Sequence, residues 1–478
     1  MPLWQRSLFL FGPHWGSCWP TCSLAPVPPC VLNQFQTAIM PLRSSSLLST
    51  VAASFSVALL LSVFLLGCGQ SSSRETASFC DPQDGGLALP EGFCATVVAD
   101  SLGPTRHLTV ANNGDVYAAV REVTNGGGVV ALRDTNGDYT ADRAEYFVEE
   151  AGGTGIGLHN GFLYFGPDTA IWRFRRADGE LVPSGNKEVI VSGFPEQSQH
   201  AVKPFDVDGN GHLYVNVGAP SNACMEQTRT KGSPGMDPCP LLEEHAGIWR
   251  YRAGATGQTH SPDARYASGI RNAVALMWND AANSLYAVQH GRDQLHSFFP
   301  DLYSQEESAE LPAEEFFKVD AGDDFGWPYC YYDWMTETKV LGPEYGGDAA
   351  TVGRCDQFEA PIQAFPGHWG PNAVLFYDGT QFPEKYQNGA FIAWHGSWNR
   401  APLPQEGYKV TFTPFDGAQP AGDYETFADG FAGVDTLRSP GNAEHRPTGL
   451  AVGPDGGLYV SDDENGTIWR IAYVGNDN

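Results

Sequence analysis

Basic residues are scarce in this sequence. Its 478 residues include 28 Lys and Arg against 56 Asp and Glu, which gives a formal net charge of −28 at pH 7. This excess of negative charge argues against nucleic acids and anionic membranes as partners, because both would repel the protein. It fits an exported protein in saline surroundings.

Two cysteine motifs are also missing. The sequence contains neither C-x-x-C nor C-x-x-C-H, so it gives no sign of a zinc knuckle or of covalently attached c-type haem. Glycine and proline, by contrast, are frequent, with 55 and 34 residues, and 12% of the residues are aromatic. This composition is typical of packed sheets joined by many turns, with few long helices.

The N-terminal part of the chain is predicted to lie outside the folded domain. A charged segment at Met40–Arg43 precedes a nearly continuous apolar run over residues 47–66, and Leu65–Cys68 resembles the cleavage site of a bacterial lipoprotein. A single transmembrane helix is the alternative. The predicted segments are an upstream extension (1–39), a lipoprotein signal peptide (40–67) and a polar tether (68–86).

Lipid on Cys68 would be the protein's only contact with a membrane. It would place the protein in the bacterial cell envelope, on the periplasmic or the outer surface. An exported protein reaches an oxidising compartment, where cysteines pair. Beyond Cys68, six cysteines allow fifteen connectivities. We predict sequential pairing, which closes three short loops: Cys80–Cys94, Cys224–Cys239 and Cys330–Cys355.

One pattern recurs six times between residues 87 and 473. It is an apolar strand, a turn rich in Asp, Asn and Gly, a second strand, and a third strand ending in aromatic and Arg residues, as in the hairpin over residues 199–217. Repeats of this size predict an all-β fold, a six-bladed β-propeller, followed by a tail at 474–478. The strand at 93–99 would complete the last blade. A pair of open β-sandwiches is the rival fold.

Long insertions at 222–245 and 296–365 hold two of the predicted disulfides and would form walls on one face. On such a face the inner strands begin and converge on a funnel. Their starts carry Arg106, His200, Arg271 with Asn272, His368, and His445 with Arg446. A cationic funnel suits an anionic ligand with several carboxylates, because Arg binds carboxylate through two hydrogen bonds. A neutral His among Arg residues can act as a general base.

Several ordered motifs resemble the glucose/sorbosone dehydrogenase family, and most closely its L-sorbosone dehydrogenase branch. They are Gly269–Asn272, Ala275–Leu276, Tyr286–Gly291, Phe325–Cys330 and His395–Arg400. The resemblance covers residues 87–473. It implies a propeller that holds pyrroloquinoline quinone (PQQ) with Ca²⁺, oxidises an aldose or a sugar aldehyde such as sorbosone, and passes two electrons to an external acceptor.

The resemblance also implies roles for single residues. His200 matches the catalytic base, which takes the proton of the C1 hydroxyl while hydride moves to the quinone. Arg271 matches the Arg beside the quinone carbonyl, where it stabilises developing negative charge, and Asn272 is its neighbour. Gly291 and Arg292 fall where the family binds Ca²⁺ through backbone carbonyls. The positions expected to bind quinone carboxylates are those of Arg121, Arg400 and Arg446.

The sequence departs from the family at one important position. Sugar-oxidising relatives carry a Gly-Asp pair whose Asp orients the catalytic His, but this chain has Gly218-Ala219. Asn222 and Glu226 are the candidates to replace that Asp. Two other functions therefore remain open, a Ca²⁺-dependent propeller lactonase or hydrolase and a non-catalytic binding propeller. The loop at 134–142 resembles a calcium loop and equally well an acidic hairpin turn.

Overall fold

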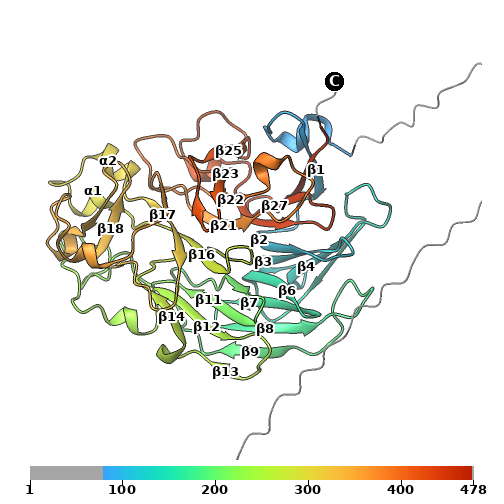
Figure 1. Cartoon of the computed structure of the whole chain (residues 1–478), viewed down its shortest axis with the longest axis horizontal. Helices are drawn as coiled ribbons and strands as arrows, with labels where there is room; N and C mark the ends of the chain where they lie inside the picture. Colours follow the sequence, from blue (N-terminus) through green and yellow to red (C-terminus); the bar gives the residue numbers. More distant parts are fainter. Residues whose placement is uncertain (1–78, 476–478) are drawn as a thin grey trace, which may run out of the picture. The chain divides into compact units, whose positions relative to one another are not determined.

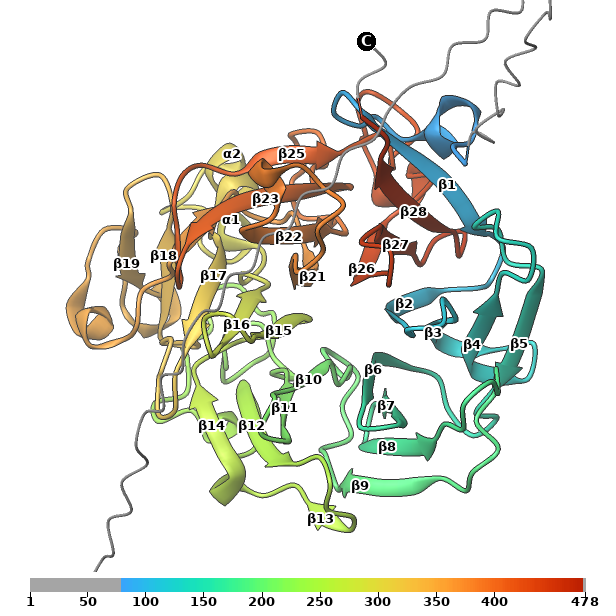
Figure 2. The same cartoon turned by 45° about the vertical axis from the view of Figure 1, so that its right-hand side comes forward.

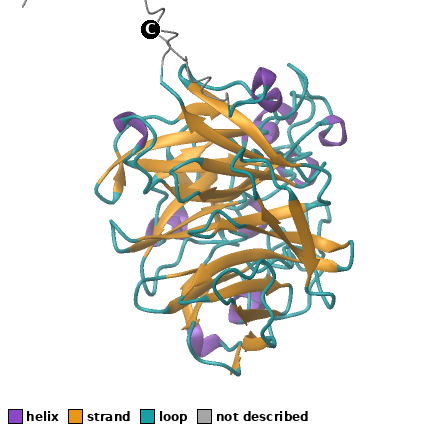
Figure 3. Cartoon of the chain, turned by 90° about the vertical axis from the view of Figure 1, so that its right-hand side faces the viewer, coloured by secondary structure: helices purple, strands orange, loops and turns teal. Residues whose placement is uncertain are grey.

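The computed structural model describes residues 79–475. The predicted extension, signal peptide and lipidation site at Cys68 lie outside the described residues. In the described part strands predominate, and the helices are short (Figure 3). No helix in residues 79–475 is long and apolar enough to cross a membrane.

Six sheets form a ring around a central axis, which confirms the predicted six-bladed propeller (Figures 1 and 2). Blade one contains β2 (Thr105–Val110), β3 (Val116–Thr124), β4 (Gly127–Arg133) and β5 (Arg143–Phe147). Blade two contains β6 (Gly153–His159), β7 (Phe162–Pro167), β8 (Ala170–Arg175), β9 (Glu188–Ser192) and β13 (Gln258–Thr259). Blade three contains β10 (Phe205–Val207), β11 (His212–Val217), β12 (Gly247–Arg252) and β14 (Arg265–Ser268).

The remaining three blades complete the ring (Figure 2). Blade four contains β15 (Ala275–Asn279), β16 (Ser284–Gln289), β17 (Glu314–Val319) and β20 (Gln363–Phe365). Blade five contains β21 (Pro371–Phe376), β22 (Gly389–Trp394), β23 (Lys409–Asp416), β24 (Gln419–Pro420) and β25 (Glu425–Ala428). Blade six contains β26 (Pro447–Val452), β27 (Leu458–Asp462), β28 (Ile468–Tyr473) and β1 (Phe93–Ala99).

The hairpin of blade three illustrates how sequence determines a blade. Asp208 Oδ1 accepts the backbone N–H groups of Asn210 at 2.9 Å and His212 at 2.8 Å, which closes the turn between β10 and β11. Alternate residues of β11 then face opposite neighbours. Leu213 is buried in a core shared with blade two, whereas Tyr214 is buried in a core shared with blade four. A blade therefore needs a neighbour on each side to bury both its faces.

The N-terminal strand closes the ring. β1 pairs antiparallel with β28, from Phe93 opposite Tyr473 to Val97 opposite Trp469. The predicted completion of the last blade is therefore confirmed. Residues 79–86, expected in the tether, pack on this blade: Asp81 Oδ2 accepts the N–H of Val97 at 2.6 Å, and Trp469 Nε1 donates to Gly85 O at 3.1 Å.

The six described cysteines pair sequentially, as Cys80–Cys94, Cys224–Cys239 and Cys330–Cys355. The second and third disulfides lie in the two long insertions, beside blades three and four. The insertions and other connections contain these short elements: α1 (Leu295–Phe298), α2 (Gln305–Glu310), β18 (Cys330–Asp333), β19 (Thr338–Leu341), and the 3₁₀ turns η1 (Pro82–Gly86), η2 (Pro240–Glu243), η3 (Pro262–Ala264), η4 (Pro343–Tyr345), η5 (Gly353–Gln357), η6 (Glu384–Tyr386) and η7 (Pro440–Asn442).

Removing a side chain at the closure should destabilise the whole propeller. Trp469 is 0% exposed and packs edge-on against Phe431, so Trp469→Ala should lower the free energy of unfolding by about 3–5 kcal/mol. Trp398, which is 55% exposed, is the matched control, and Trp398→Ala should change it by no more than about 0.5 kcal/mol. Urea denaturation measures both changes. Equal midpoints for the two variants would contradict this account of the closure.

Candidate functional site

A cavity of about 450 Å³ opens on the face where the inner strands of blades three to five begin. It collects residues from the blade connections and from the insertion closed by Cys224–Cys239. Its polar lining includes Gln199, His200, Arg229, Arg271, His290, Asp293, Glu314, His368, Ser397 and Asn399. Trp398, the most exposed of the lining aromatics, stands beside them. The predicted convergence of His200 and Arg271 is therefore found in the structure.

His200 is oriented by backbone atoms. Its Nδ1 lies 2.6 Å from the carbonyl oxygen of Ala219, so Nδ1 carries the proton and donates it, and Nε2 is left as the acceptor. Nε2 makes no hydrogen bond within residues 79–475. His200 was expected to lack the Asp that would orient it, and the carbonyl of Ala219 orients it instead. Asn222 bonds elsewhere and Glu226 is exposed, so neither takes the place of the missing Asp.

A side-chain amide fixes the backbone under this His. Gln197 Nε2 donates to the carbonyl oxygens of Gln199 at 2.7 Å, His200 at 3.0 Å and Gly218 at 2.9 Å. His200 has a φ of 52°, in the left-handed region that non-glycine residues rarely adopt. Such strain persists only where the surroundings impose it. Gln197 supplies that restraint by joining the two segments that meet at His200.

The position of Gly218 explains why this residue has no side chain. A Cβ built there would lie 2.6 Å from the Cβ of His200 and 2.6 Å from Oδ1 of Asn272. Both atoms belong to buried or tightly held groups, so neither can move away easily. Gly218 is required because His200 packs directly against its backbone.

Burial and the positive charge of Arg271 lower the pKa of His200 from 6.5 to about 3. The hydrogen bond from Nδ1 to Ala219 opposes this shift but does not outweigh it. His200 is therefore neutral at physiological pH. A neutral imidazole with a free Nε2 has the form that a general base requires.

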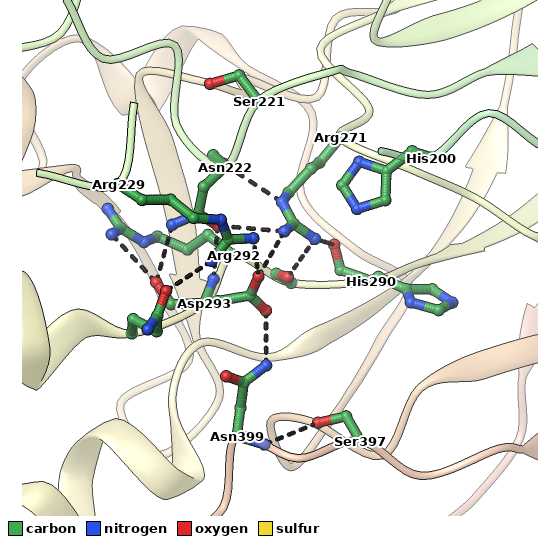
Figure 4. Close-up of polar contacts among 12 residues, drawn as sticks. His200, Ser221, Asn222, Arg229, Arg271, His290, Arg292, Asp293, Ser397 and Asn399 are labelled. Carbon is green, nitrogen blue, oxygen red and sulfur yellow. Dashed lines mark hydrogen bonds and ion pairs between the residues drawn. The ribbon is translucent and has the colours of Figure 1, made fainter. Parts of the chain in front are cut away.

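Arg271 is held by several hydrogen bonds behind the cavity wall. It is 3% exposed. Its Nε donates to Asn222 O at 3.2 Å and its Nη1 to Gly291 O at 2.8 Å. Its Nη2 donates to Asn222 Oδ1 at 3.1 Å and to Asp293 Oδ2 at 2.9 Å. The guanidinium is thus fixed in one orientation, and its charge faces the cavity beside His200 (Figure 4).

Asp293 links three segments of the site (Figure 4). Its Oδ2 accepts from Arg271 and from Arg229, each at 2.9 Å, and its Oδ1 accepts from Asn399 Nδ2 at 2.8 Å. Burial alone would raise the pKa of Asp293, but the positive charge of Arg271 and the hydrogen bond from Arg229 hold it well below its ordinary value. Asp293 is therefore an anion that two guanidinium groups share.

Glu314 joins blades four and five at the cavity. Its Oε2 accepts the N–H of Gly291 at 2.7 Å, and its Oε1 accepts the N–H of Gly370 at 3.1 Å. Burial raises the pKa of Glu314 to about 7, although these two hydrogen bonds oppose the shift. The carboxyl group fixes the backbone of Gly291, whose carbonyl oxygen in turn holds Arg271.

Five of the predicted arginines do not line the cavity, among them Arg106, which forms an ion pair with Asp463. Arg121 forms a two-point ion pair with Asp168, at 2.8 and 2.9 Å. Arg292 is buried in an ion pair with Glu344, at 2.5 and 2.6 Å. The other two are Arg400, which binds Glu310 and the carbonyls of Ala309 and Gly367, and Arg446, which binds the carbonyls of His395 and Gly396. Each lies outside the cavity lining and is held by protein oxygen atoms.

The remaining predicted positions are also engaged by protein atoms. Asn272 is buried, and its Oδ1 lies 3.4 Å from Asn216 Nδ2. Gly291 lines the cavity and bonds Arg271 through its carbonyl. Loop 134–142 is a hairpin turn in which Asp134 accepts the N–H groups of Asn136 and Gly137 at 2.9 and 2.7 Å. Within residues 79–475 no group of three or more His, Cys, Asp or Glu side chains could hold a metal ion.

Charged and amide residues of the site that were not predicted as functional include Arg229, Asp293, Glu314 and Asn399. Asn399 lies within the motif His395–Arg400, so the family resemblance could have identified it as a site residue. Glu314 begins β17, a third strand of its blade, whereas the prediction considered the starts of inner strands. Arg229 lies in an insertion, where no repeat or strand period marks a position.

The part of the chain that matches a known family coincides with the propeller. The TrAA12-like family matches residues 87–474. An uncharacterized protein of Borreliella burgdorferi is 30% identical over 208 residues, covering 43% of this chain and 48% of that protein. A pyrroloquinoline quinone-dependent pyranose dehydrogenase of Coprinopsis cinerea is 27% identical over 232 residues, covering 42% of this chain and 30% of that protein. The chain thus spans half or less of these relatives.

Two solved structures share the fold. The calcium structure of Trichoderma reesei carbohydrate-active enzymes family AA12 superimposes with a TM-score of 0.67 at 16% identity, over 83% of this chain and 99% of that one. The holo form of the PQQ domain of Coprinopsis cinerea pyranose dehydrogenase superimposes with a TM-score of 0.63 at 19% identity, over 81% of this chain and 97% of that one.

The protonation of His200 can be measured directly. NMR of protein labelled at histidine should show His200 neutral, with the proton on Nδ1, throughout pH 5–8, because its pKa lies near 3. Below pH 6.5 the unfolded chain binds a proton here that the folded chain refuses, so this residue lowers the stability of the fold as pH falls. His200→Gln assigns the signal. Titration of His200 near pH 6.5 would contradict the described environment.

A methyl group at Gly218 should displace His200. Gly218→Ala should lower the free energy of unfolding by about 1–3 kcal/mol and shift the NMR signal of His200. Gly209, in the same hairpin, is the matched control, because a Cβ there meets only Asp280 Oδ1 at 3.7 Å. Urea denaturation and the His200 signal compare the two variants, and an unchanged His200 signal in Gly218→Ala would exclude the contact.

Proposed function

The chain belongs to the TrAA12-like family, and we propose that it is a PQQ-dependent oxidoreductase that oxidises an aldose or a sugar aldehyde. The predicted kinship with PQQ-dependent sugar dehydrogenases is confirmed at the level of the family. One arrangement supports the activity above all others: the neutral imidazole of His200 lies in a cavity beside two guanidinium groups.

The cavity has features that suit this cofactor. PQQ is planar and carries three carboxylates. Arg229 and Arg271 supply positive charge, and exposed Trp398 offers an aromatic surface at the edge. Asn399 Oδ1 is buried and has no hydrogen-bond partner among residues 79–475. A buried acceptor without a partner is costly, so a donor from a bound molecule would satisfy it.

His200 performs the acid–base step in this proposal. Its Nε2 accepts the proton of the C1 hydroxyl of the sugar, and the Nδ1 hydrogen bond to Ala219 keeps the ring in the tautomer that allows this. Bound PQQ would supply the two-electron acceptor for the C1 hydride. Ala219 carries no charge, so the imidazolium formed at His200 lacks the carboxylate partner of sugar-oxidising relatives. Asp293 is the carboxylate of the described network whose charge acts on His200.

Arg271 and its partners keep the site ready for this step. The guanidinium is bonded on three of its nitrogens and does not have to reorganise when charge develops. A fixed positive charge beside the reacting centre stabilises negative charge that forms there. It also adds to the effect of burial in lowering the pKa of His200, which is therefore unprotonated before the reaction. One residue thus serves both the base and the developing anion.

Calcium does not fit the residues as the structure presents them. The predicted ligands are the backbone carbonyls of Gly291 and Arg292, and Ca²⁺ requires six to eight oxygens. Gly291 O already accepts from the Arg271 guanidinium at 2.8 Å, so a cation bound to the same oxygen would lie close to a positive charge. Asp293, the nearby carboxylate, is shared by two arginines. We derive no catalytic step through Ca²⁺.

The hydrolase alternative has the same difficulty. It requires carboxylate and amide side chains that are free to bind Ca²⁺. Asp293 is engaged by two guanidinium groups, and Glu314 by two backbone N–H groups. We propose further that the substrate is a sorbosone-like sugar, that the electrons pass to an external acceptor, and that lipid on Cys68 anchors the protein in the cell envelope.

Reconstitution tests the proposed activity. Purified protein should bind PQQ at micromolar concentration, with and without Ca²⁺, and should reduce an artificial electron acceptor when an aldose or sugar aldehyde is added. His200→Ala should leave PQQ binding intact and lower turnover by about 10²–10⁴-fold, because it removes the general base. Absorbance of the quinone reports binding, and dye reduction reports turnover. Absence of binding would overturn the proposal, and full turnover in His200→Ala would remove His200 from its role.

A further inference from the structure

We infer that Arg229, carried by the insertion closed by Cys224–Cys239, recognises a carboxylate of the bound cofactor. This inference rests on the proposed function and goes beyond it, since it assigns recognition to a residue outside the propeller repeats. Arg121, Arg400 and Arg446, which the family resemblance suggests for this role, do not line the cavity.

Arg229 lines the cavity and has N–H donors beyond those that it uses on protein atoms. Its Nη2 donates to Asp293 Oδ2 at 2.9 Å and its Nη1 to Gln294 Oε1 at 2.5 Å. A guanidinium has five N–H groups, and these contacts use two of them. The side chain is 29% exposed, and Arg229 lines the cavity. Donors and positive charge are therefore available to a molecule in the cavity.

The other cationic groups offer much less. Arg271 uses Nε, Nη1 and Nη2 on protein oxygens and is 3% exposed. Arg121 and Arg400 do not line the cavity, and each is paired with a carboxylate elsewhere. The histidines of the lining are neutral, because burial lowers the pKa of His200 to about 3 and that of His290 to about 4. Accessible positive charge in the cavity is thus concentrated on Arg229.

The balance of charge also favours an anion. Arg229 and Arg271 share a single carboxylate, Asp293, so the three groups together carry one excess positive charge. The whole chain, by contrast, has a net charge of −28. A local positive charge on an acidic protein attracts anions to that place and to few others. Carboxylate is the group that a guanidinium binds best through paired hydrogen bonds.

The insertion holds Arg229 in a defined place. Besides the disulfide, Met236 N donates to Cys224 O at 2.9 Å, Glu226 N to Pro234 O at 2.9 Å, and Gln227 N to Ser233 Oγ at 3.0 Å. Arg229 itself has a φ of 52°, a conformation that costs free energy for any residue with a side chain. The loop is therefore built to present this side chain, which Figure 4 shows directed at Asp293.

The test measures cofactor affinity without turnover. Arg229→Met keeps the length of the side chain but removes its charge and donors, and it should raise the Kd for PQQ at least tenfold. Arg229→Lys, which keeps the charge, should raise it less. Arg121→Met is the matched control and should leave the Kd within twofold of the wild type. Quenching of tryptophan fluorescence and calorimetry both report binding.

A second probe identifies the group that is recognised. The trimethyl ester of PQQ lacks the negative carboxylates, so wild-type protein should bind it more weakly than PQQ. Arg229→Met should lose most of that discrimination, whereas Arg121→Met should retain it. Circular dichroism and urea denaturation confirm that each variant is folded, and Arg229→Gln replaces Arg229→Met if the latter is not.

The outcomes separate the two claims. If wild-type protein binds no PQQ, the proposed function fails, and this inference fails with it. If the wild type binds PQQ and Arg229→Met binds it equally well, the inference alone is overturned. A raised KM for the sugar with an unchanged Kd for PQQ would place Arg229 at the substrate and would likewise overturn it.

Discussion

The pairing of β1 with β28 is the constraint on which the rest of the structure depends. Each blade buries both its faces only between two neighbours, as Leu213 and Tyr214 show on opposite sides of one strand. An open row of blades would leave two faces exposed to water. The N-terminal strand closes the ring, and both faces are then buried. Closure also brings the starts of distant inner strands together, and that convergence creates the cavity around His200.

Within the cavity, charge is arranged so that one base stays neutral among cations. Arg271 is restrained by Asn222, Gly291 and Asp293. Burial, together with the positive charge of Arg271, lowers the pKa of His200 and keeps it unprotonated. The backbone carbonyl of Ala219 orients the imidazole, where the family resemblance implied an Asp. A carbonyl fixes the tautomer equally well but adds no negative charge, so the site depends on Asp293 for the anion that balances its two guanidinium groups.

Much of the fold could be predicted because it follows from repetition. Six similar segments predicted six blades, and the spare strand at 93–99 predicted the closure. His200 and Arg271 were predicted because they begin inner strands. The positions of the other predicted arginines depend on partners remote along the chain, which the repeat pattern does not reveal: Arg121 pairs with Asp168, and Arg400 with Glu310. The role of Ala219 could not be predicted, because its backbone oxygen orients His200 and every residue carries such an oxygen.

A crystal structure of the protein with PQQ bound would show where the cofactor lies. We expect the quinone in the cavity beside His200, with Nε2 of that residue facing the place of the reacting sugar carbon and a carboxylate of the quinone within hydrogen-bond distance of Arg229. Quinone bound instead in the central channel lined by His107 and Asp206, or on the outer wall of an insertion, would contradict this expectation.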